Sequence, residues 1–138
     1  MAPLSPRREH ARARRAYGQN FLADPSIARR LADLAVTVPD VPVFEVGAGR
    51  GRLTRELLRR GVRVFAYEID PDLARTLPRH ASLTVRNENF LAAPPPGEAF
   101  AVAGNIPYGL TSPVIEWCLD TPGLRRATLL TQWDVSAF

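Results

Sequence analysis

The segment Asn105-Ile106-Pro107-Tyr108 carries the residue types in this chain best suited to chemistry, and it follows the apolar run 100–103. The side-chain oxygen of Asn105 and the backbone carbonyl of Ile106 can both accept hydrogen bonds from one NH2 group. Pro107 fixes its own φ and stiffens the turn, and Tyr108 offers a face on which a heteroaromatic ring can stack. We predict that these catalytic residues hold a planar exocyclic amine while a methyl group is delivered to its nitrogen. The alternative is a plain proline-containing turn at the end of a strand.

A glycine-rich loop, Gly47-Ala48-Gly49-Arg50-Gly51, follows the apolar run 43–46 and precedes a helical repeat of leucines. Glycines at such a junction let a ligand approach the backbone and leave helix N-terminal N–H groups free to bind it. Arg52 stands where a dinucleotide-binding fingerprint needs its last glycine, which argues against NAD or FAD. We therefore predict that Gly47 and Gly49 contact a different nucleoside cofactor.

Glu68 ends the next predicted strand, 19 residues after Gly49. A carboxylate at this place can accept hydrogen bonds from both ribose hydroxyls of an adenosine-type ligand. The alternative interpretation of Glu68 is an ordinary surface charge.

The elements that must position these residues alternate along the chain. Short apolar runs predict strands, and apolar residues at helical spacing predict helices between them. Asp-Pro pairs at 24–25 and 70–71 are typical of an N-cap followed by the first helical residue. This alternation predicts an α/β fold with right-handed crossovers and a parallel sheet, whose carboxyl edge would carry the glycine loop, Glu68 and the Asn105 turn. The predicted strands are 43–46, 62–67, 83–85, 100–103 and 127–131, and the predicted helices are 25–36, one over the leucine repeat after the glycine loop, one from Asp70-Pro71 to about 77, and one opening at 112–113.

Composition bounds the function further. A chain of 138 residues with 46% hydrophobic and 23% charged residues is expected to form one soluble domain. It has neither an apolar run that could span a membrane nor the apolar core of a signal peptide, and its lone cysteine, Cys118, suits a reducing compartment. We therefore expect a cytoplasmic protein without a membrane partner, and we predict no metal site.

All 18 basic residues are arginine. The absence of lysine excludes a phosphate-binding P-loop and a lysine Schiff base. Arginines crowd the first residues of the chain, which predicts a flexible basic arm over 1–16 that binds phosphate. The alternative is a solvated tail without a function. Residues 17–138 would then form part of a catalytic domain. The arginines of the arm are Arg7, Arg8, Arg12, Arg14 and Arg15.

Four segments in family order resemble the rRNA adenine N6-dimethyltransferases, the KsgA/Erm family, and look most like its actinobacterial Erm branch. They are 17–22 (YGQNFL), 44–54 (FEVGAGRGRLT), 67–70 (YEID) and 104–112 (GNIPYGLTS). The resemblance implies a Rossmann-like S-adenosylmethionine-dependent methyltransferase fold and an RNA-binding enzyme. It implies that the cofactor, S-adenosyl-L-methionine, is bound near Gln19, Asn20, Leu22, Gly47, Glu68 and Asn105.

The resemblance also implies a substrate, an adenine of 23S rRNA, and resistance to macrolide, lincosamide and streptogramin B antibiotics. The 16S rRNA branch is the nearer alternative. In the family an Asp after the third strand accepts a hydrogen bond from the cofactor's adenine. Asn89 stands at the matching position of this sequence, so the charge is lost, and Glu88 is the alternative if the register shifts by one residue.

The same resemblance implies that the chain lacks the last two strands of the sheet and the helical C-terminal domain. The fifth strand would then be an exposed edge, which invites aggregation. We expect a monomer. Three alternatives stay open at this point: an impaired methyltransferase, an inactive cofactor-binding or RNA-binding remnant, and a methyltransferase with a target other than rRNA.

Overall fold

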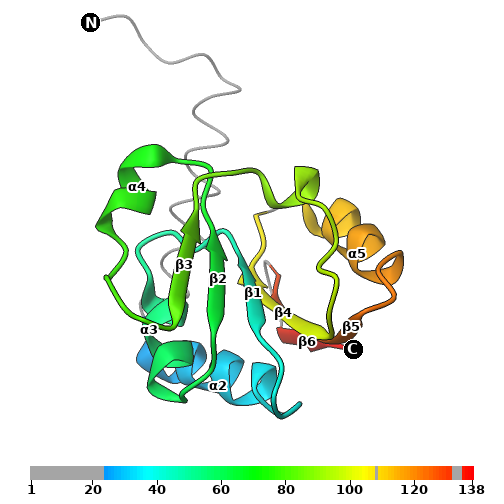
Figure 1. The fold of residues 1–138 in the computed structure, drawn as a ribbon, viewed down its shortest axis with the longest axis horizontal. Coiled ribbons are helices and arrows are strands. Elements are labelled where there is room, and N and C mark those ends of the chain that lie inside the picture. Colours follow the sequence, from blue (N-terminus) through cyan, green and yellow to red (C-terminus); the bar gives the residue numbers. More distant parts are fainter. Residues whose placement is uncertain (1–23, 108, 132–134) are drawn as a thin grey trace, which may run out of the picture.

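The computed structural model describes residues 24–107, 109–131 and 135–138. Its centre is a six-stranded sheet in the order β3-β2-β1-β4-β5-β6 (Figure 1). Neighbouring strands from β3 to β5 are parallel. The crossovers therefore bring the carboxyl ends of these strands to one edge, as the sequence predicted. The strands are β1 (Val43–Val46), β2 (Val64–Tyr67), β3 (Leu83–Arg86), β4 (Phe100–Asn105), β5 (Leu124–Leu130) and β6 (Val135–Ala137).

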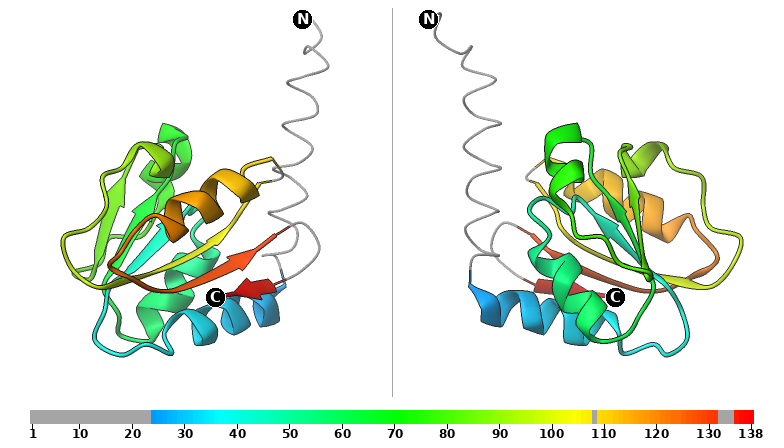
Figure 2. Two further views of the ribbon diagram at one scale, coloured as in Figure 1. Left: turned by 90° about the vertical axis from the view of Figure 1, so that its right-hand side faces the viewer. Right: turned by 60° about the vertical axis from the view of Figure 1, so that its left-hand side comes forward.

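Helices cover both faces of the sheet (Figure 2). The predicted caps of two helices are confirmed, because the side chain of Asp24 accepts from Ser26 N and that of Asp70 from Asp72 N. The short 3-10 helix η1 was not predicted from the sequence. The elements are α2 (Pro25–Ala35), α3 (Arg52–Arg59), α4 (Pro71–Thr76), η1 (Phe90–Ala92) and α5 (Thr111–Leu119).

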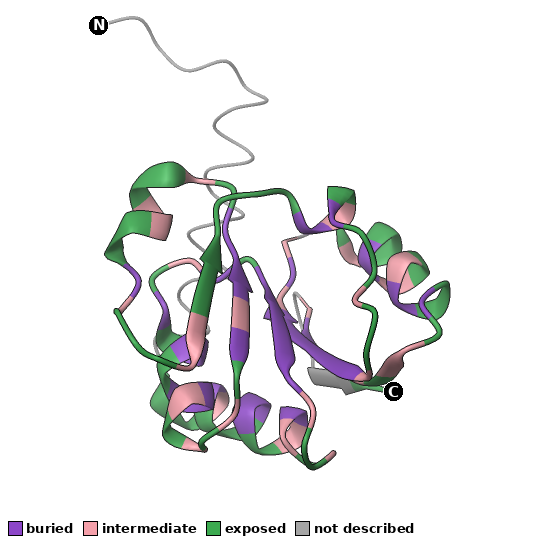
Figure 3. Cartoon of the chain, viewed as in Figure 1, coloured by how far each residue is buried: buried purple, intermediate pink, exposed green. Residues whose placement is uncertain are grey.

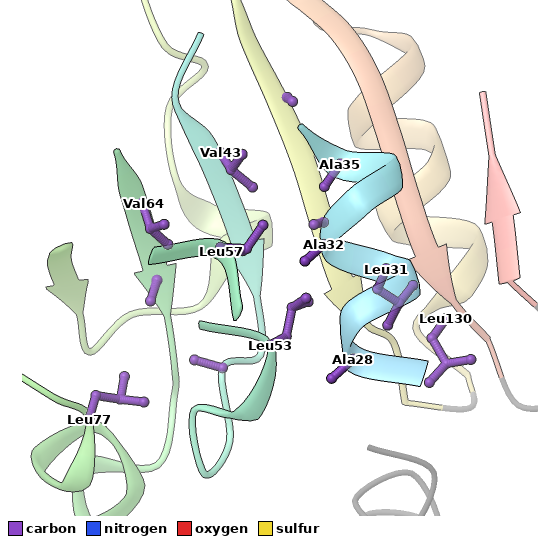
Figure 4. Close-up of a cluster of buried hydrophobic side chains, with 14 residues drawn as sticks. Ala28, Leu31, Ala32, Ala35, Val43, Leu53, Leu57, Val64, Leu77 and Leu130 are labelled. Carbon is purple, nitrogen blue, oxygen red and sulfur yellow. The ribbon is translucent and has the colours of Figure 1, made fainter. Parts of the chain in front are cut away.

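The sheet is buried between two hydrophobic clusters, and β1 and β4 form its most buried part (Figure 3). One cluster joins α2 and α3 to the sheet, with Leu31, Leu53 and Leu57 directed into it (Figure 4). The other cluster joins α5 and η1 to the opposite face. Burial on both faces explains why every residue of β1 except Glu45 is apolar.

The predicted parallel sheet is confirmed for β1 to β5, but the expectation that the fifth strand is an exposed edge was wrong. β6 pairs antiparallel with β5, from Thr128↔Ala137 to Leu130↔Val135. Ala127 and Phe138 exchange two further backbone hydrogen bonds of 2.9 and 3.0 Å. The outer edge of β5 is therefore paired over 127–130. A strand of three residues has too short a pattern to be predicted from periodicity.

Gly104 brings β4 close to β1. A Cβ at Gly104 would lie 2.6 Å from the backbone oxygen of Val46, and backbone cannot yield as a flexible side chain can. We expect Gly104→Ala to lower the free energy of unfolding by about 1–3 kcal/mol. The control is Gly97→Ala, since a Cβ at Gly97 meets nothing within 4 Å. Urea unfolding followed by circular dichroism measures both variants, and equal stabilities would contradict the prediction.

Candidate functional site

Predicted site residues that follow or end three strands lie side by side at the carboxyl edge of the sheet, with Asn87 at the end of a fourth strand. The last residue of β1 is in register with the last residue of β2 and with Gly104 of β4, and the last residue of β2 is in register with the last residue of β3. The residues that come next are Gly47, Glu68, Asn87 and Asn105. The prediction that the glycine loop, the acidic residue and the Asn105 turn meet at one edge is confirmed.

The glycine loop folds back across this edge. Gly47, Gly49 and Gly51 all have positive φ, between 57° and 83°, which only glycine adopts without strain. The N–H groups of Gly47 and Ala48 both donate to the backbone oxygen of the last β2 residue, at 2.9 and 3.0 Å. A Cβ at Gly47 would lie 3.7 Å from the backbone oxygen of Asn105. The loop therefore presents bare backbone between the ends of β2 and β4.

Glu68 is buried, with an exposed fraction of 7%. Its Oε1 accepts from Gly49 N at 2.7 Å and its Oε2 accepts from Asp70 N at 2.9 Å. The alternative interpretation as a surface charge is wrong. Each carboxylate oxygen has a further lone pair, so Glu68 can hold the glycine loop and still accept hydrogen bonds from a diol.

Asn87 is a positioning residue that the sequence analysis missed. Its Nδ2 donates to the backbone oxygens of Glu68 and Ile69, at 2.8 and 3.1 Å. These bonds hold the turn after β2 against the end of β3. Ile69 is 67% exposed beside Glu68, so the edge also offers an apolar surface next to its carboxylate.

Asn89 is exposed, and its side-chain oxygen accepts from Leu91 N at 3.1 Å, which caps η1. The amide oxygen therefore has a local structural use. Its predicted contact with a cofactor stays a prediction, as does the alternative role of Glu88, which is also exposed.

Asn105 is the last residue of β4 and is partly exposed. Ile106 is buried, its N–H donates to Leu130 O at 2.9 Å, and the carbonyl of Pro107 accepts from Leu110 N at 3.0 Å. These bonds fix the backbone on both sides of the turn. Within the described ranges, no group forms a hydrogen bond with the Asn105 side-chain amide. Four of the predicted site residues lie outside the described residues: Tyr108, Gln19, Asn20 and Leu22.

Glu45 is a second carboxylate that sequence reasoning missed. It lies in β1 with an exposed fraction of 1%, and Thr54 of α3 donates a hydrogen bond to it. Burial raises the pKa of Glu45 to about 7, against the lowering effect of the Thr54 hydrogen bond and with a smaller contribution from the nearby charge of Glu68. The sequence feature that could have indicated it is an acidic residue inside the otherwise apolar run 43–46.

The raised pKa of Glu45 predicts a pH-dependent stability. Between pH 4.5 and about 7 the folded chain keeps a proton on Glu45 that the unfolded chain has lost. Stability from this group is therefore full below pH 4.5 and declines as the pH rises through 7, by about 3 kcal/mol. Because Glu45→Gln cannot ionise, we expect it to remove this part of the decline between pH 5 and pH 8 in urea unfolding. The exposed Glu98→Gln variant should keep the decline, and identical pH profiles for the parent and Glu45→Gln would contradict the assignment.

Two kinds of site are not found in the part of the chain that the structure describes. No cluster of three or more His, Cys, Asp or Glu side chains could hold a metal ion there. No described helix is both long and apolar enough to cross a membrane.

Comparison with known proteins identifies the family of this chain. The family model of ribosomal RNA adenine dimethylase matches residues 10–137. An rRNA adenine N-6-methyltransferase of Saccharopolyspora erythraea is 48% identical over 96% of this chain and 36% of its own length. A ribosomal RNA small subunit methyltransferase A of Thermotoga maritima is 38% identical over 90% of this chain and 46% of its own length. The crystal structure of the 23S rRNA methyltransferase ErmE superposes with a TM-score of 0.73 at 46% identity, covering 78% of this chain and 46% of that chain.

The five parallel strands, the glycine loop after β1 and the acidic end of β2 define a Rossmann-like methyltransferase fold. The chain belongs to the ribosomal RNA adenine dimethylase family. It spans less than half the length of these curated relatives.

Proposed function

We propose that this chain transfers a methyl group from S-adenosyl-L-methionine to the N6 amino group of an adenine in 23S rRNA. The observation that carries the proposal is the row of Glu68, Gly47 and Asn105 on three neighbouring strands at one sheet edge. This row puts a diol acceptor, a bare backbone and an amide acceptor next to one another along one sheet edge. Ligands of open α/β sheets bind at this edge.

The residues present fit the proposed cofactor. The Glu68 carboxylate keeps lone pairs for ribose hydroxyls. The absence of a side chain at Gly47 leaves space between the glycine loop and the backbone oxygen of Asn105. Asn20, Leu22 and Asn89 are proposed as further contacts. The cofactor, when bound, supplies an electrophilic methyl group on a positively charged sulfur.

The chain's own contribution would be to position the acceptor amine. The Asn105 side-chain oxygen and the Ile106 carbonyl are proposed to accept from the two N–H groups of one amine, which favours a pyramidal nitrogen with an available lone pair. Ile106 is held by its burial and by its bond to Leu130, so its carbonyl needs no rearrangement to accept this hydrogen bond. Tyr108 would stack on a base that has left its helix, offsetting part of an unstacking cost of a few kcal/mol.

The choice of 23S rRNA over 16S rRNA rests on similarity. The relative called an rRNA adenine N-6-methyltransferase is 48% identical, and the small-subunit enzyme is 38% identical. ErmE, a 23S rRNA methyltransferase, superposes at 46% identity. We propose that the consequence is resistance to macrolide, lincosamide and streptogramin B antibiotics, and that the protein acts as a monomer in the cytoplasm, where ribosomes are assembled.

The test uses the purified chain, S-adenosylmethionine with a labelled methyl group, and fragments of 23S and 16S rRNA. We expect N6-methyladenine in the 23S fragment and at least tenfold less label in the 16S fragment. The reverse ratio would assign the 16S branch. Cofactor binding without transfer to either RNA would instead indicate the inactive remnant.

A further inference from the structure

A groove on the α2–α3 side of the molecule is rich in arginine. It is lined by Arg50 of the glycine loop, by three arginines of α3, and by Glu56 and Ala28. The four arginines are exposed, whereas Glu56 and Ala28 are buried in its floor. The proposed methyl-transfer site uses none of these residues. The α3 arginines are Arg52, Arg55 and Arg59.

The α3 arginines form one stripe along the helix. Arg52, Arg55 and Arg59 have spacings of three and four residues, which place side chains on the same helical face. The stripe spans about 10 Å at 1.5 Å per residue. It begins next to Arg50, inside the loop whose Gly49 N–H binds Glu68. The groove therefore starts at the proposed cofactor edge and runs away from it along α3.

The single carboxylate in the floor neutralises only part of the positive charge of this groove. Glu56 pairs with Arg59 and, at 3.0 Å, with Arg60, which lies outside the groove and also binds Asp33. Among the described residues, Arg50 and Arg52 have no carboxylate within ion-pair distance. The Arg55 guanidinium donates to the backbone oxygen of Arg50 at 2.7 Å, which keeps its charge in the groove.

Helix stability does not account for these charges. The first turn of α3 holds Arg52 and Arg55 and no acidic residue. The helix dipole favours anions at this end and disfavours cations, by about 0.3–1 kcal/mol for each charge. An anion bound beside Arg52 would gain from both the guanidinium groups and the dipole. The arginines therefore destabilise this end of α3 in the free protein, and a bound anion would offset that loss of stability.

We infer that the Arg50–Arg59 groove binds phosphates of the substrate RNA on one side of the adenine at the Asn105 turn. The inference rests on the proposed function, because the RNA is its substrate. Arginine matches phosphate through paired N–H donors. A linear stripe that starts at the reaction edge suits a polyanion with evenly spaced charges better than a single small anion.

The test compares Arg52→Gln/Arg59→Gln with the charge-matched control Arg79→Gln/Arg125→Gln. The control arginines are exposed, and they lie before β3 and at the start of β5, at the opposite edge of the sheet. Arg55 is left intact because it holds the Arg50 backbone. Fluorescence anisotropy gives the Kd for a labelled single-stranded fragment of 23S rRNA across a salt series, and calorimetry gives the Kd for S-adenosylmethionine.

We expect the groove variant to bind RNA at least about tenfold more weakly, and the slope of log Kd against log salt to fall by about 1.4, which is 0.7 for each lost phosphate contact on a single strand. The control should keep the parent slope, and both variants should bind the cofactor within twofold of the parent. Equal losses in the two variants would overturn the inference, as would a loss of cofactor binding in the groove variant. Binding of a poly-glutamate peptide that depends on Arg52 and Arg59, with RNA binding unchanged, would overturn it in favour of an acidic protein partner.

Failure of the inference and failure of the proposed function are distinguishable. If the parent chain methylates 23S rRNA but the groove variant binds it with the parent's Kd and salt slope, only the inference falls. If the parent chain neither binds nor methylates the RNA, both fall.

Discussion

Asn105→Ala is expected to lower the rate of methyl transfer by at least about 100-fold, because it removes the acceptor proposed to orient the target amine. The fold should survive this change. Asn105 ends β4 with a partly exposed side chain, and the atom that a Cβ at Gly47 would meet is the Asn105 backbone oxygen, which alanine retains. Asn105→Asp keeps acceptor oxygens and should retain more activity than the alanine variant.

The measurement is a single-turnover rate with labelled S-adenosylmethionine at saturation and the enzyme in excess over a 23S rRNA fragment. Ser112→Ala is the matched control, since Ser112 is an exposed polar residue just beyond the same turn. It should transfer at the parent rate. If Asn105→Ala stays within threefold of the parent, the turn does not position the reacting amine.

The sequence predicted the elements that depend on local patterns. The run 43–46 is apolar enough to identify a buried strand, and Gly47, Gly49 and Gly51 mark its turn because positive φ is cheap only for glycine. The Asp-Pro pairs that begin two helices are also recognised from neighbouring residues alone. Once the crossover rule is applied, these patterns place the glycine loop, Glu68 and Asn105 at one edge without any knowledge of side-chain contacts.

The features that the sequence did not predict depend on contacts between distant residues. The Asn87 bonds to the turn after β2 cross 18 and 19 positions and require the pairing of β2 with β3. The buried carboxylate of Glu45 accepts a hydrogen bond from Thr54, and these two residues meet only because α3 packs on β1. Whether Glu68 is a site residue or a surface charge could be decided only from its bond to Gly49, 19 residues away. Hydrophobic periodicity carries no information about such polar pairs.

Glu68→Gln is expected to raise the Kd for S-adenosylmethionine by about 10- to 100-fold. Hydrogen bonds to a charged group are each worth about 1.5–3 kcal/mol, and the carboxylate would make them to the ribose. The substitution also places an NH2 group against either Gly49 N–H or Asp70 N–H, both of which now donate to the carboxylate at 2.7 and 2.9 Å. The amide can keep only one of these two bonds, so the cofactor would lose a direct contact, and either the glycine loop or the turn after β2 would lose its bond to this side chain.

Calorimetric titration of the cofactor measures this effect, and Glu98→Gln is the control because Glu98 is an exposed carboxylate outside the predicted site. A second measurement reports on the position of the Glu68 charge without any cofactor. The charge of Glu68 raises the pKa of Glu45, so Glu68→Gln should move the Glu45-dependent loss of stability to lower pH. A shifted stability profile with an unchanged cofactor Kd would mean that the Glu68 charge lies near Glu45 in the fold but does not bind the ribose.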